Sequence, residues 1–264
     1  MRQVLDATIC LLLTLAFFGC QTLQTTPNTS PFQYQFVREQ LVLHSDFLLP
    51  EKHRLIEELS LLRHQLSEKL AIPTTDEPIH VYLFSSDASY YGFLKQQFPN
   101  FPTRRAIFVE TDIELAVYAH WGDHIAEDLR HEVAHGYLHA AIPNLPLWLD
   151  EGLAEYFEVG FSRKGLNQTH LDLLNAQIDL AAWQPDLDRL EQLASAAEMS
   201  QLDYAEAWAW VHYLLNSDDD KANLLTGYLA DLRQATTANR LGTRIEKRLA
   251  APQLALVEHI QMLR

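Results

Sequence analysis

The sequence is poor in cysteine and in clustered positive charge. Two cysteines, Cys10 and Cys20, occur among its 264 residues, and no run of lysine or arginine offsets a formal net charge of −15 at pH 7. A surface this acidic repels phosphate backbones, so we expect no nucleic acid as a partner. The hydrophobic content of 48% is typical of a folded chain that buries one or two ordinary cores.

Long hydrophobic segments are also scarce. The N-terminal apolar stretch, residues 7–18, is too short to cross a bilayer as a finished helix, but its length suits a secretory signal. The ending "AFFGC" resembles the cleavage box of bacterial lipoproteins, in which the cysteine becomes the acylated first residue. We therefore expect residues 1–19 to be a signal peptide and Cys20 to carry lipid. A plain signal peptide and an uncleaved anchor are the alternatives.

This processing has two consequences. Cleavage before Cys20 removes Cys10, so the mature chain would have no intramolecular disulfide even in a compartment that permits one. Gln21, rather than an aspartate, follows the lipidated position and favours the outer membrane of a bacterial cell envelope, facing the periplasm. The partner at this end of the chain would be the membrane, through the lipid anchor.

The rest of the chain divides by pattern into a tether and one folded domain. Residues 20–31 are polar and threonine-rich, without apolar periodicity, as in a flexible tether. Between residues 32 and 122, strand patterns alternate with helical ones and predict a small α/β lobe with a mixed sheet. From residue 123 to 264 nearly every segment repeats apolar residues at intervals of three and four, which predicts a helical lobe. The predicted fold class is α+β.

The segment "LRHEVAHG" contains His131, Glu132 and His135. On a helix over residues 123–140, the two histidines project from one face and can meet a single metal ion. Two surface histidines on an amphipathic helix are the alternative. Catalytic zinc normally takes three protein ligands, and His139 cannot be the third, because it lies about 12 Å from His131 along a continuous helix.

A second segment, "PLWLDEGLAEYFE", begins with Pro146 and places Glu151 and Glu155 one helical turn apart. A short turn would fold this helix back across the first one. The pair "HEVAH" and "WLDEGLAEYF" resembles the gluzincin metallopeptidases, in which a glutamate on the following helix is the third zinc ligand. In the aminopeptidase branch the second motif reads W-L-N-E-G-F-A, whereas Asp150 and Leu153 stand here in place of Asn and Phe.

The resemblance implies that zinc is bound by His131, His135 and Glu151, between the two lobes, and that Glu132 is the general base. Glu155 is placed to accept a hydrogen bond from the free ring nitrogen of His131. A solvated helix carboxylate is the alternative for Glu155.

The segment "LDYAEAWAWVHYLL" resembles the helix of this family that begins with a catalytic tyrosine, and Tyr204 occupies that position. The residues after it depart from the usual pattern, so a core aromatic is the alternative. His212 is a rival donor without motif support, and His120 and His124 are expected at the surface or in the substrate cleft. The strand at residues 113–120 is a candidate sheet edge for an extended peptide.

These features predict a zinc-dependent metallohydrolase, most simply a peptidase acting on a peptide or protein substrate. A non-catalytic domain that keeps zinc for stability and a hydrolase of cell-wall amides are the alternatives.

Overall fold

The computed structural model describes residues 31–101, 103–234 and 240–264. The predicted signal peptide, Cys20 and nearly all of the tether therefore lie outside the described residues, and the lipid anchor stays a prediction. No helix in the described part of the chain is long and apolar enough to cross a membrane.

A five-stranded mixed sheet forms one layer of the fold, as predicted, with strand order β1-β2-β3-β5-β4. The two outer pairs, β1 with β2 and β4 with β5, are antiparallel, whereas β3 is parallel to both β2 and β5. The strands are β1 (Tyr34–Arg38), β2 (Leu41–Ser45), β3 (Ile79–Phe84), β4 (Ala106–Glu110) and β5 (Leu115–His120).

The order of the strands corrects one prediction, because the edge beside the helices is β4 and not β5. A tight turn, in which the Thr111 amide donates to the Glu114 carbonyl, folds β5 back along β4 and into the interior position beside β3. Residues 115–119 of β5 are all buried, as expected of a strand covered on both faces.

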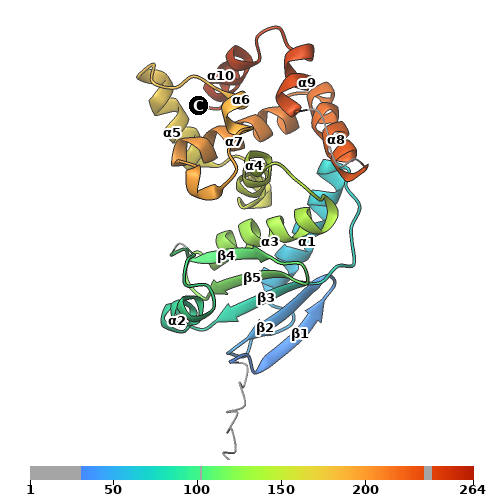
Figure 1. Ribbon diagram of the computed structural model, residues 1–264, viewed down its shortest axis with the longest axis vertical. Helices are drawn as coiled ribbons and strands as arrows, with labels where there is room; N and C mark the ends of the chain where they lie inside the picture. Colours follow the sequence, from blue (N-terminus) through green and yellow to red (C-terminus); the bar gives the residue numbers. More distant parts are fainter. Residues whose placement is uncertain (1–30, 102, 235–239) are drawn as a thin grey trace, which may run out of the picture. The chain divides into compact units, whose positions relative to one another are not determined.

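Helices cover both faces of the sheet (Figure 1). α1 (Arg54–Leu70) and α3 (Ile125–Ala141) pack on one face, against inward side chains such as Leu43, Val81 and Val117. α2 (Asp87–Gln97) packs on the other face, against Phe84 and Tyr118. Because α3 contacts β4 and β5, the sheet layer extends to residue 141, beyond the boundary predicted at residue 122.

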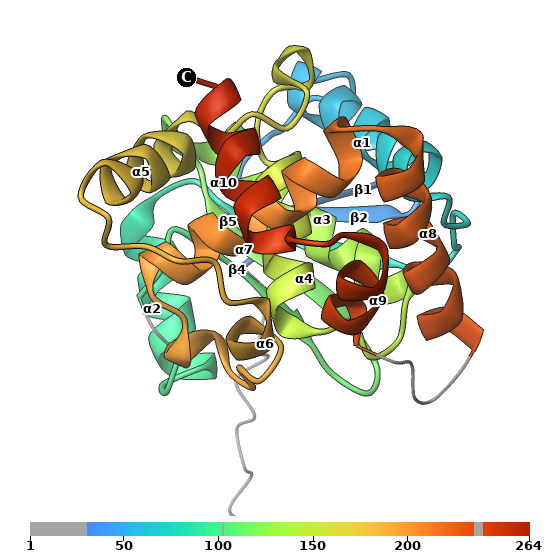
Figure 2. The ribbon, with the colours of Figure 1, turned by 90° about the horizontal axis from the view of Figure 1, so that it is seen from above.

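The remaining helices form a second layer, as the apolar periodicity predicts. They are α4 (Leu147–Phe157), α5 (Gln168–Asp179), α6 (Leu187–Leu190), α7 (Gln201–Asn216), α8 (Asp219–Gln234), α9 (Leu241–Arg248) and α10 (Pro252–Met262). α7 lies at the centre of this layer and contacts α4, α5, α8 and α10 (Figure 2). Its residues 203–214 are all buried, so α7 is the core helix of the layer.

The crossing of α4 over α7 depends on a glycine. A Cβ atom added at Gly152 would lie 2.6 Å from the carbonyl oxygen of Ala207, closer than such atoms approach in real structures. The absence of a side chain therefore lets the two helices pack backbone to backbone, and it fixes the position of α4 in the fold.

We expect Gly152→Ala to lower the free energy of unfolding by about 1–3 kcal/mol, because a rigid backbone must move to admit the methyl group. Gly227→Ala in α8 is the matched control, since nothing lies within 4 Å of its added Cβ. Better helix propensity should stabilise that variant by about 0.5–1 kcal/mol. Urea unfolding of both variants measures the difference, and equal midpoints would contradict the close approach.

A pair of buried imidazoles joins α7 to α10. Nδ1 of His212 lies 2.9 Å from Nε2 of His259, so one of the two rings donates a proton to the other. Burial lowers the pKa of both histidines to about 4, and the charges of Lys69 and Lys221 act in the same direction. Both rings are therefore neutral in the native state at neutral pH.

This pair should destabilise the native state in acid. In the unfolded chain the two histidines bind protons below their ordinary pKa of about 6.5, whereas in the native state they bind protons only near pH 4. The free energy of unfolding therefore falls as the pH is lowered from about 6.5 to about 4. When the pH is lowered from 7 to 5, the free energy of unfolding of wild type should fall by about 1 kcal/mol more than that of His259→Gln. This figure allows for solvent screening of a partly exposed ring. Urea unfolding midpoints of both proteins at the two pH values test this expectation. Equal losses of stability in wild type and in His259→Gln would show that the pair does not titrate as described.

Candidate metal centre

α3 presents the two motif histidines from a face opposite to its anchor. Ile125, Leu129, Val133 and Tyr137 are buried and anchor α3 in the core. Acidic residues in the first turn favour the start of this helix through the helix dipole. The packing of these four residues therefore fixes which way the histidines point.

A short turn brings α4 back across α3. Asn144 adopts a left-handed backbone conformation with φ of 60°, and Pro146 is the N-cap of α4, close to its predicted place at the helix start. α3 and α4 then pack against each other, which places Glu151 of α4 beside the histidines of α3.

The three predicted zinc ligands converge. Nε2 of His131 lies 3.3 Å from Nε2 of His135, and Oε2 of Glu151 lies 3.7 Å from each of these nitrogens. Glu151 is only 6% exposed, and its Oε2 has no hydrogen-bond partner among the described residues. A buried, unpaired carboxylate oxygen is costly unless a cation compensates it. Two imidazoles and one carboxylate also form a donor set that suits zinc.

The other ring nitrogens of both histidines are held by carboxylates. Nδ1 of His131 donates to Oε2 of Glu158 at 2.9 Å, and Nδ1 of His135 donates to Oδ1 of Asp150 at 2.8 Å. A carboxylate that accepts at Nδ1 favours the tautomer with its proton there, and Nε2 of each ring faces the Glu151 carboxylate. Both imidazoles are therefore prepared to bind a metal through Nε2.

The predicted partner of His131 is wrong, since Glu158 occupies the place expected for Glu155. Oε2 of Glu155 instead lies 2.8 Å from Nε2 of His170 on α5, and Asn167 donates to the carboxylates of both glutamates. Burial would raise the pKa of Glu155, but the contact with His170 lowers it. Burial and the charge of Glu155 raise the pKa of Glu158. Helical spacing places Glu155 and Glu158 on similar faces of α4, and only the packing of α5 separates their roles.

Asp150, which replaces the asparagine of the aminopeptidase motif, also contacts His139. Its Oδ2 lies 3.0 Å from Nε2 of His139, whose Nδ1 lies 2.6 Å from Oε2 of Glu110 on β4. Burial lowers the pKa of His139, but these two carboxylates outweigh burial and raise it to about 9. His139 is therefore a cation that neutralises Asp150 and, as predicted, lies outside the group formed with Glu151.

Glu132 lines a pocket together with His135 and Glu151, and Tyr204 contacts Arg104 of the same pocket. Glu132 is 8% exposed, and burial raises the pKa of its carboxyl group despite the opposing effect of His131 and His135. The Tyr204 hydroxyl accepts a hydrogen bond of 3.3 Å from Nη2 of Arg104. Burial and the charge of Glu151 raise the pKa of Tyr204, so the hydroxyl keeps its proton at neutral pH.

The other histidines considered from the sequence lie elsewhere. His212 pairs with His259, the ring of His120 packs on Tyr90 and Tyr91, and His124 caps the N-terminus of α3. Sequence reasoning missed Arg104, because it stands in the loop before β4 outside any motif. The signal in the sequence that could have indicated Arg104 is its place beside Arg105, because adjacent arginines stand out in so acidic a chain.

Two pockets flank the site. The larger pocket, of about 590 Å³, lies along β4, and the residues that line it include Ile107, Phe108, Glu132, His135 and Glu151. The smaller pocket, of about 390 Å³, is lined by residues that include Tyr91, Arg105, His131 and Glu132. Arg104 lines both pockets. We call the two together the cleft.

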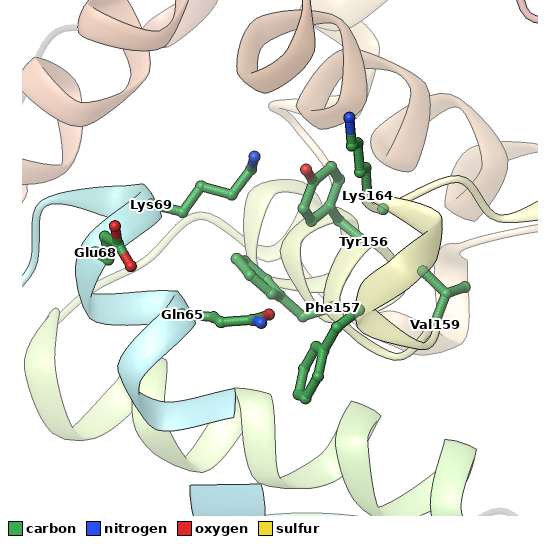
Figure 3. Close-up of a pocket in the computed structure, with 9 residues that line it drawn as sticks. Gln65, Glu68, Lys69, Tyr156, Phe157, Val159 and Lys164 are labelled. Atoms are coloured by element: carbon green, nitrogen blue, oxygen red, sulfur yellow. The ribbon is translucent and has the colours of Figure 1, made fainter. Parts of the chain in front are cut away.

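A further hollow of about 320 Å³ shares no residue with the cleft. Figure 3 shows Lys69 of α1 and Lys164 on either side of Tyr156 at its rim. None of the groups of described residues that are able to hold a metal includes a residue of this hollow.

Comparisons with known proteins give distant likenesses. One family, described as a protein of unknown function (DUF1570), matches residues 125–231, less than half of the chain. No curated protein matches. A solved two-domain M1 zinc metallopeptidase bound to L-arginine is similar at a TM-score of 0.47 and 16% identity, over 83% of this chain and 47% of that one.

An M1 zinc metallopeptidase from Deinococcus radiodurans is similar at a TM-score of 0.41 and 17% identity, over 82% of this chain and 47% of that one. This chain thus spans about half the length of both solved chains. With likenesses this distant, function has to be argued from the site itself.

We expect the purified protein to bind one zinc ion per chain through the three converging ligands. Glu158→Ala should weaken zinc binding about 10- to 100-fold, because it removes the acceptor that orients His131. Glu155→Ala is the matched control on the same helix and should cost much less, since Glu155 contacts His170. Competition with a zinc-binding dye measures both affinities, and a larger loss in the Glu155 variant would reverse the assignment of these two glutamates.

Proposed function

We propose that this protein is a zinc-dependent hydrolase that cleaves peptide bonds, with zinc held by His131, His135 and Glu151. One observation carries the proposal: a buried carboxylate oxygen of Glu151, without a hydrogen-bond partner among the described residues, faces two imidazole nitrogens at the base of an open cleft. A purely structural zinc site would be closed by a fourth protein ligand. The cleft beside these atoms therefore favours catalysis over a stabilising metal.

Zinc bound there would polarise a substrate carbonyl and lower the pKa of a water ligand toward 7. Glu132 then acts as the general base that accepts a proton from the attacking water. Burial, which raises the pKa of this carboxyl group, brings it nearer to the working pH of a general base. Because Glu132 lines both pockets of the cleft, it can return that proton to a leaving group on either side.

Tyr204 acts as the donor to the oxyanion. Its hydroxyl accepts a hydrogen bond from Arg104, a residue that lines the cleft, and this leaves the proton of the hydroxyl free to be donated. Burial keeps this proton in place by raising the pKa of the phenol. A neutral donor aimed at developing negative charge is what acyl transfer requires.

The edge strand β4 favours a peptide over another amide. One side of β4 pairs with β5, and its other side has no partner strand among the described residues, so its backbone groups can pair with an extended chain. Ile107 and Phe108 of β4 line the cleft, and the ring of Phe108 stacks on His135 with centroids 5.9 Å apart. A peptide added to β4 would therefore run directly past the metal ligands.

We expect Glu132→Gln to retain zinc and fold, because glutamine has the same volume, but to lose at least about a hundredfold in activity, because it cannot accept the proton. Tyr204→Phe should lose less, since it removes a single oxyanion donor. Hydrolysis of a mixed peptide library by wild type and both variants, with zinc content measured in each, tests these expectations. Cleavage by the Gln variant at the wild-type rate would falsify the role of Glu132, and a wild type inert on every peptide would favour the non-catalytic alternative.

A further inference from the structure

Arg104 brings a positive charge into the cleft without an acidic partner. Its guanidinium donates to the Tyr204 hydroxyl, and no carboxylate of the described residues lies within the 4.0 Å of an ion pair with it. The residue is exposed, so the guanidinium is accessible to a ligand. An arginine in this position can still form several hydrogen bonds, since its planar head has five N–H donors.

The neighbouring arginines differ in this respect. Arg105 makes a two-pronged contact with Asp128, through Nε at 3.0 Å and Nη2 at 2.7 Å. Nη1 of Arg130 lies 3.0 Å from Oε2 of Glu58. Both side chains are therefore engaged in holding the fold together, whereas Arg104 is not.

The acidic groups of the cleft already have partners or roles. Asp150 is held by His135 and His139, and Glu158 by His131. Under the proposed function, Glu151 is a metal ligand and Glu132 is the base. Their charges act on Arg104 from a distance but do not occupy its hydrogen-bond donors.

The wall of the larger pocket supplies no other permanent cation. Apart from His135 and the three carboxylates at its base, the described residues that line it are Arg104 and uncharged side chains, including Phe101, Ile107, Phe108 and Ala196. A substrate anion in this pocket would therefore have one charged side chain to bind, and that is Arg104.

We propose that Arg104 binds a substrate carboxylate, so that the cleft selects peptides with an acidic group next to the bond that is cleaved. This inference rests on the proposed peptidase function and deepens it. The guanidinium fork matches a carboxylate in two parallel hydrogen bonds, which a lysine or a neutral donor does not. Since Arg104 lines both pockets, the carboxylate lies beside the reacting carbonyl rather than at a distant position of the peptide.

The carboxylate has two sources, an aspartate or glutamate side chain and the free carboxy-terminus of a peptide. The first source is tested with internally quenched alanine hexapeptides in which one position at a time carries either glutamate or glutamine. The same peptides with a free or an amidated C-terminus distinguish the second. Wild type should cleave the acidic member of the matched pair about 10- to 100-fold more efficiently in kcat/KM, as expected for hydrogen bonds to a charged group.

Arg104→Gln should bring this ratio close to one, because the acidic peptide loses its carboxylate partner in addition to the loss that both peptides share through Tyr204. Arg104→Lys should restore part of the ratio. Arg105→Gln is the matched control, because it removes an adjacent charge that already pairs with Asp128, and it should leave the ratio unchanged. An equal loss on acidic and neutral peptides in Arg104→Gln would overturn the proposal, since it would make Arg104 a second donor to the common carbonyl. Equal cleavage of both peptides by wild type would also overturn it.

A binding measurement separates this proposal from the peptidase activity. Succinyl hydroxamic acid and its carboxamide analogue share a metal-binding group and differ in one carboxylate. Calorimetry on the zinc-loaded protein should show tighter binding of the acid, by about 10-fold or more, and loss of this preference in Arg104→Gln. If no peptide is cleaved but the preference is present, the peptidase proposal fails and the anion site stands. Equal affinities for the two compounds would overturn the anion site even where peptides are cleaved.

Discussion

The burial of the Glu151 carboxylate against two imidazoles is the constraint on which the site depends. A carboxylate oxygen without a hydrogen-bond donor among the described residues is costly to bury, and here it is held between two helices that belong to different layers. α3 packs on the sheet, α4 packs on α7, and the missing side chain of Gly152 sets how closely α4 approaches α7. The packing of these helices thus brings one carboxylate against two imidazoles.

Much of this architecture could be predicted from local patterns. Alternating side chains identified the strands, the three-and-four spacing identified the helices, and the His131–His135 and Glu151 motifs came together as predicted. These signals suffice because each depends on residues close together in the sequence, and the turn between α3 and α4 is too short to permit many arrangements.

What could not be predicted depends on contacts between distant segments. β5 is an interior strand because its turn folds it between β4 and β3, and an apolar run of five residues reads equally well as an edge or a centre strand. Glu158 rather than Glu155 reaches His131 because α5 brings His170 to the other glutamate. Arg104 belongs to the site through a loop whose path no periodicity reveals.

The division of the ligands between layers has a mechanical meaning. Both histidines are carried by the sheet layer and Glu151 by the helical layer, so an ion bound to all three is a cross-link between them. Losing the ion and parting the layers are then coupled events, and each makes the other easier. Exchange of an ion held by all three residues would therefore be coupled to an opening motion between the two layers.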